Sequence, residues 1–172
     1  MGNIISLDAA GRHFAMSNGL TSVLIDVLGL SGTRLAKTDT EKRMIVWLLE
    51  KDQSAAGGGT VGFDICEMPW NDRGFDDMKR FWLCVIEAAK RRTGWELLDY
   101  PPNEALLFPC LDRFHELISM AEPDIIDHGA VESWLCDTRE DPDDPILCGY
   151  PQCPKHHVFL TVFGCHLCNG QS

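Results

Sequence analysis

Near its C-terminus the chain reads Cys153-Pro154-Lys155-His156 and, after the apolar run 157–163, Gly164-Cys165-His166-Leu167-Cys168-Asn169-Gly170. Each stretch carries a pair of Cys or His side chains separated by two residues. Gly and Asn permit the positive φ angles that sharp turns between such pairs require. A reversing chain presents both side chains to one ion, and Zn²⁺ is held tetrahedrally by four thiolates or imidazoles. The spacing therefore predicts a C-terminal zinc-binding hairpin with the ligands Cys153, His156, Cys165 and Cys168.

Three residues near Cys153 are candidates for the fourth ligand. His156 has the same two-residue gap from Cys153 that separates the ligands of the second turn. His157 is adjacent, and Cys148 lies five residues before Cys153, so that a Cys₄ site is an alternative. A site closed by four protein ligands has no open position for water and is structural rather than catalytic. We therefore expect the metal to stabilise the fold.

The eight cysteines do not indicate a disulfide scaffold, because such scaffolds belong to short secreted chains. Residues 1–6 lack the basic region and long apolar segment of a secretory signal. Cys66, Cys84 and Cys110 lie among apolar neighbours and are expected to be free thiols. Reduced thiols together with a zinc site lead us to expect a cytoplasmic protein.

Composition sets further bounds on the function. The chain has 172 residues, 45% of them hydrophobic and 24% charged, which suits a folded domain with its own core. No apolar run approaches the length needed to cross a bilayer. The formal net charge of −11 argues against a nucleic-acid partner, because phosphate binding needs clustered Lys and Arg. The same charge favours a basic protein partner, or simply solubility.

The pattern of apolar residues predicts an α+β fold, with helices packed on a small antiparallel sheet. A strand hairpin is expected over residues 4–16, a short strand over 63–68, and an extended segment over 95–100. Helical periodicity is expected over 18–30, 38–51, 75–92, 103–121 and 124–137. A strand is an alternative for residues 44–49, and Pro109 predicts either a kink in the helix over 103–121 or a later start of that helix. We expect residues 1–147 to form a core domain and 148–172 a zinc-knuckle subdomain packed on it. The expected core includes Phe81, Trp82, Ile86, Phe114, Leu117, Ile118 and Trp134.

An acidic segment, residues 137–144, precedes the cysteine-rich turns. A solvated loop is one interpretation of it, and a surface directed at a basic partner is the other. The cysteine-rich turns resemble zinc-ribbon and zinc-knuckle modules. Together with residues 70–72 and 95–96, the acidic segment and these turns give the chain a character similar to immunity proteins that neutralise bacterial toxins. That resemblance implies a non-catalytic protein that binds a basic toxin, such as a nuclease, and it implies Asp141, Asp143 and Asp144 as contacts.

Two other functions are compatible with parts of the sequence. A zinc ribbon is also typical of nucleic-acid-associated proteins, although the module here carries only Lys155 as a fixed positive charge. A hydrolase or transferase would need a base, for which His115 or His128 is available. The sequence contains no named catalytic motif, such as a nucleophile elbow or an H-E-x-x-H helix. A non-catalytic interaction protein is therefore the favoured hypothesis.

Overall fold

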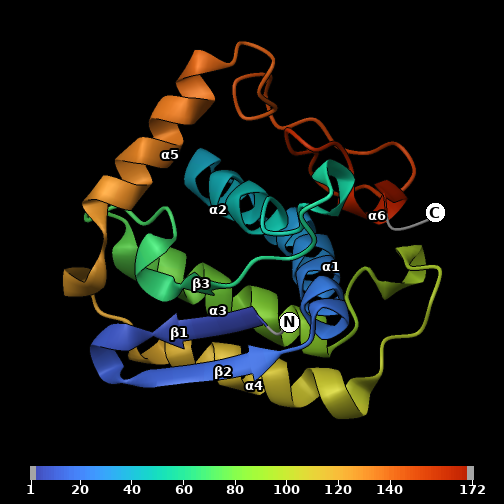
Figure 1. Cartoon of the computed structure of the whole chain (residues 1–172), viewed down its shortest axis with the longest axis horizontal. Helices are drawn as coiled ribbons and strands as arrows, with labels where there is room; N and C mark the ends of the chain where they lie inside the picture. Colours follow the sequence, from blue (N-terminus) through green and yellow to red (C-terminus); the bar gives the residue numbers. More distant parts are fainter. Residues whose placement is uncertain (1–2, 170–172) are drawn as a thin grey trace.

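The computed structural model describes residues 3–169, and Figure 1 shows their arrangement. This part of the chain contains six α-helices, several short 3₁₀ turns and a three-stranded sheet, which confirms the α+β class. In chain order the elements are β1 (Asn3–Leu7), β2 (Arg12–Met16), α1 (Asn18–Leu35), α2 (Asp39–Leu49), β3 (Phe63–Asp64), α3 (Phe75–Lys90), α4 (Glu104–Met120), α5 (His128–Glu140) and α6 (His166–Asn169).

The sheet is mixed, so the prediction of a purely antiparallel sheet was wrong. β1 and β2 form the expected antiparallel hairpin, which turns at Gly11 with a φ of 64°. β3 pairs with β1 in parallel, and the strand order is β2-β1-β3. Parallel neighbours need a long crossover, which α1 and α2 provide between β1 and β3.

Gly62 lets the chain enter β3 beside β1. A Cβ atom at this position would lie 2.2 Å from the backbone oxygen of Ile4 and 2.8 Å from its nitrogen. Those atoms belong to the backbone of the neighbouring strand and cannot swing aside as a side chain would. Only glycine therefore fits this close approach without moving the strand.

Four helices pack against one another beside the sheet: α1 against α2 and α3, and α3 against α4 (Figure 1). α1 continues through Gly29 and Gly32 to Leu35, beyond the end that was predicted at residue 30. Both glycines lie against α2, because a Cβ at Gly32 would meet the side chain of Ile45 and a Cβ at Gly29 that of Leu49. Here glycine permits close helix packing rather than ending a helix.

Most of the predicted core is confirmed. The six buried members are at most 7% exposed, namely Phe81, Trp82, Ile86, Phe114, Leu117 and Ile118. Trp134, on α5, is only partly buried. The extended segment predicted over residues 95–100 is instead a 3₁₀ turn at Trp95–Leu97. It follows Gly94, which has a φ of 85° and so redirects the chain after α3.

The C-terminal segment crosses the molecule on the α1 and α2 side (red in Figure 1). Tyr150 donates a hydrogen bond to the backbone oxygen of Asp39 at 3.2 Å, and the Phe159 amide donates one to Thr33 Oγ1 at 3.3 Å. The segment has isolated bridges at Gln152–Phe159 and Thr161–Gly164 instead of paired strands. The structure therefore shows two separate turns where a zinc hairpin was predicted.

Candidate metal centre

The first turn positions Cys153 and His156. The Cys153 amide donates to the Val158 oxygen at 2.8 Å, and the His157 amide donates to the Cys153 oxygen at 2.8 Å. His157 has a positive φ of 52°, which completes the reversal of the chain. Val158 is fully buried, so the end of this turn is anchored in the protein core. The local fold thus keeps Cys153 and His156 on one side of the turn.

The second turn positions Cys165 and Cys168. Thr161 and Gly164 exchange backbone hydrogen bonds of 3.0 and 2.9 Å, and Gly164 has a φ of 85°. Cys165 follows directly, and the short helix α6 brings Cys168 to the same side one turn later. Leu167, on the same helix, is 8% exposed and packs into the core.

The two turns bring four ligand atoms together. The atoms are the three sulfurs and Nδ1 of His156, all within 4.8 Å of one another. His156 Nδ1 lies 3.7, 3.6 and 3.4 Å from the sulfurs of Cys153, Cys165 and Cys168, respectively. The sulfurs of Cys153 and Cys168 are 3.7 Å apart.

These separations fit a tetrahedral metal ion. Metal–sulfur bonds of about 2.3 Å and metal–nitrogen bonds of about 2.0 Å place tetrahedral ligands roughly 3.5 to 3.8 Å apart. A disulfide would need sulfurs at about 2.05 Å, far closer than those of Cys153 and Cys168. The Cys₃His group can therefore hold a metal ion such as Zn²⁺. All four positions of a tetrahedral ion would be filled by protein, as in structural sites.

The electrostatics of the cluster suit a cation. Burial raises the pKa of the Cys165 thiol to about 12. Burial also acts to raise the pKa of Cys153, but the amides of His156 and Lys155 donate to its sulfur and lower that pKa overall. Burial lowers the pKa of His156 and so favours the neutral imidazole, the form that binds metal. A buried cation would compensate the thiolates that this site brings together.

The alternative ligands lie away from the cluster. His157 is exposed and belongs to the outer side of the first turn. Cys148 is exposed too, and its sulfur lies 3.8 Å from the backbone oxygen of Pro142. The structure therefore brings His156 into the group and leaves His157 and Cys148 outside it.

The acidic residues singled out from the sequence are placed differently from one another. Asp141 and Asp143 are exposed just after α5. Asp144 is only 4% exposed, because its carboxylate turns inward and accepts a hydrogen bond from the Ile146 amide at 2.9 Å. Asp141 and Asp143 are thus accessible on the surface, whereas Asp144 stabilises the turn through its hydrogen bond to the Ile146 amide.

A small cavity of about 200 Å³ lies beside α5, and we call it the acidic cavity. Its lining includes four carboxylates together with an aromatic and an apolar side chain, namely Glu50, Asp137, Asp141, Asp144, Trp134 and Val162. Trp134 Nε1 donates to Glu50 at 2.7 Å, yet burial raises the pKa of Glu50 to about 7. Glu50 could not be identified from the sequence, because the other carboxylates that line the cavity are distant from it in the chain.

The two histidines considered as catalytic bases lie on the surface. His128 Nε2 is 3.0 Å from Asp72 Oδ2, and both side chains are 68% exposed. His115 Nε2 is 3.7 Å from Glu87, and its side chain is 36% exposed. Both pairs have the geometry of ordinary surface ion pairs.

Comparison of the chain with protein-family models, with curated proteins and with solved structures found no match. Over residues 3–169, no helix is both long and apolar enough to cross a membrane.

Proposed function

We propose that this protein is a zinc-stabilised interaction protein that binds a basic protein partner, as an immunity protein binds and neutralises a toxin. The observation that carries the proposal is the acidic cavity beside α5. Four of the residues that line it are carboxylates, and no basic side chain is among its described lining. Carboxylates gathered in this way favour a partner that brings Lys or Arg.

The lining of the cavity supports a cationic side chain as its occupant. Trp134 forms one wall, and the face of a tryptophan ring attracts Arg and Lys. Glu50 is half-buried in the same lining, and burial raises its pKa to about 7. A guanidinium or ammonium group from a partner would stabilise the ionised form of Glu50, because an opposite charge favours a carboxylate.

The metal centre is linked to the acidic cavity through the loop that carries Val162. Val162 lines the acidic cavity and lies, in the sequence, between the first metal-binding turn and the second. A Zn²⁺ ion at Cys153, His156, Cys165 and Cys168 would fix both turns and so restrain the loop that carries Val162. The metal is then a structural cofactor, and the surface around the acidic cavity is the functional surface.

The proposal is tested by charge reversal on the exposed carboxylates. A partner is captured from a lysate with the wild-type protein, and its association rate is then measured for the Asp141→Lys, Asp143→Lys double variant. We expect the association rate at low salt to fall about tenfold or more and to lose most of its salt dependence. The control is the Glu122→Lys, Asp124→Lys double variant, which has the same net charge change at another exposed site. Equal association rates for the wild type and the first variant would overturn the proposal.

A further inference from the structure

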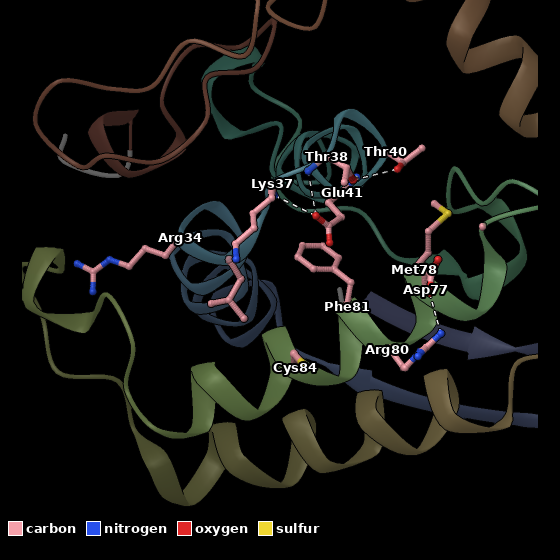
Figure 2. Close-up of a pocket in the computed structure, with 12 residues that line it drawn as sticks. Arg34, Lys37, Thr38, Thr40, Glu41, Asp77, Met78, Arg80, Phe81 and Cys84 are labelled. Carbon is pink, nitrogen blue, oxygen red and sulfur yellow. Dashed lines mark hydrogen bonds and ion pairs between the residues drawn. The ribbon is translucent and has the colours of Figure 1, made fainter.

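A second cavity, of about 690 Å³, lies at the other end of α2 from the acidic cavity. Figure 2 shows it between the end of α1, the start of α2 and one face of α3. It is lined by apolar, basic and acidic side chains that the proposed function does not use. Its size is that of a small-molecule site, for which about 300 to 1,000 Å³ is typical.

The floor of this cavity is apolar. Met78 and Phe81 come from α3 one helical turn apart, and Figure 2 shows Phe81 rising toward the start of α2. Leu35, at the end of α1, adds a third apolar side chain, and the exposed thiol of Cys84 lies one turn beyond Phe81. This floor offers an apolar ligand a surface on which to bury its hydrocarbon part.

The charges around the cavity are mostly compensated within the protein. Arg34 pairs with Glu96, and Arg80 pairs with Asp77 at 2.7 Å. Glu41 has no ion-pair partner among residues 3–169, but its Oε1 accepts hydrogen bonds of 3.0 Å from the amides of Lys37 and Thr38, as part of the capping box of α2.

Lys37 is the exception among the basic residues that line the cavity. Its ammonium group has no ion-pair partner among residues 3–169. In Figure 2 the side chain extends from the α1–α2 connection down over the end of α1, between the labelled side chains of Arg34 and Phe81. An uncompensated cation beside an apolar floor is complementary to a ligand that combines an anionic head with a hydrocarbon body.

We propose that this cavity binds a small amphipathic carboxylate, with its carboxylate on Lys37 and its hydrocarbon part against Leu35, Met78 and Phe81. The net charge of −11 repels anions in general, so binding of such a ligand would depend on the local charge of Lys37. This cavity and the acidic cavity lie at opposite ends of α2. The proposed ligand site and the proposed partner surface can therefore be tested independently of each other.

Cys84 provides a reporter inside the cavity. Decanoate, kept below its micelle concentration, is added to the zinc-loaded protein, and the rate of Cys84 alkylation by iodoacetamide is followed by mass spectrometry. At ten times its Kd, decanoate should slow this rate about tenfold, because only about a tenth of the protein stays unliganded. Cys136, an exposed thiol on α5, is the internal control, and its rate should not change.

Two comparisons test the role of charge. Lys37→Glu should weaken decanoate about tenfold or more, whereas Arg91→Glu, an equal charge change at an exposed site at the end of α3, should leave binding unchanged. A negative charge before α2 favours its N-terminus, so the Lys37 variant should fold. Decylammonium, with the same chain and the opposite charge, should protect Cys84 far less.

Three results would overturn the proposal. They are no protection of Cys84 by decanoate, equal protection by decylammonium, and an equal loss of affinity in the Lys37 and Arg91 variants. Equal protection by decylammonium would mean that the cavity binds hydrocarbon whatever the charge of the head group, as it could bind an apolar side chain of a protein partner.

Discussion

His166 Nε2 lies 2.9 Å from Asp26 Oδ1, and the two side chains are only 4% and 9% exposed. The contact has the distance of an ion pair, but neither ring nitrogen of His166 meets the alignment of a hydrogen bond. The Tyr100 hydroxyl donates to the other carboxylate oxygen of Asp26. His166 lies between Cys165 and Cys168, so this contact joins the second metal-binding turn to α1.

Asp26→Ala should destabilise the protein by about 1 to 3 kcal/mol, because it leaves the buried polar groups of His166 and Tyr100 without their partner. Urea unfolding of the zinc-loaded protein measures this change. Asp8→Asn, at an exposed position, is the control and should stay within about 0.5 kcal/mol of the wild type. An Asp26 variant as stable as that control would mean that the contact adds nothing.

Cys168→Ser should abolish stoichiometric zinc binding, whereas Cys148→Ser should retain it. Both cysteines are exposed, but only Cys168 has its sulfur in the four-atom cluster. Metal analysis after dialysis checks the difference, and His156→Ala against His157→Ala gives the same comparison for the imidazole ligand. If the Cys168 variant retained zinc and the Cys148 variant lost it, Cys148 and not Cys168 would be the ligand.

Glu50→Gln should stabilise the protein at pH 8 and have little effect at pH 5. Burial raises the pKa of Glu50 from 4.5 to about 7, so the folded state binds its proton more tightly than the unfolded state. Stability from this group is therefore lost as pH rises from about 4.5 to about 7, by up to about 3 kcal/mol. Urea unfolding of both proteins at the two pH values, with zinc present, measures the difference. If the difference in unfolding free energy between the wild type and the Glu50 variant were the same at pH 5 and pH 8, the raised pKa of Glu50 would be contradicted.

Gly62→Ala should cost about 2 kcal/mol or more, because its Cβ would meet the backbone of Ile4 in β1. Gly19→Ala is the matched control: Gly19 lies in α1 with nothing within 4 Å of an added Cβ. Alanine there should stabilise the helix by about 0.5 to 1 kcal/mol. Thermal unfolding compares the two, and equal effects of the two substitutions would argue against the close strand contact.

Features set by neighbours in the chain were predictable from the sequence. The helical periodicity after residue 74 predicted α3 closely, since its apolar residues recur on one face. The two metal-binding turns were predictable for the same reason, because a C-x-x-C or C-x-x-H spacing fixes two ligands locally. Their meeting in one cluster required the tertiary fold.

Features set by distant contacts were not predictable. The parallel pairing of β3 depends on β1, and the continuation of α1 through Gly32 depends on Ile45 of α2. Asp144 belongs to an acidic run that is typical of a surface, yet its hydrogen bond to the Ile146 amide turns it inward. The Asp26–His166 contact has no signature in the local sequence. The same is true of the position of Glu50 in the acidic cavity.

We expect the Cys₃His cluster to hold a structural zinc ion. Metal content of the purified, fully reduced protein, paired with thermal unfolding before and after chelation, tests it most directly. We predict one zinc per chain and a large fall in Tm on chelation, since binding to the folded state alone stabilises that state. Protein that contains no metal, and whose Tm is unchanged by chelator or added zinc, would contradict the claim.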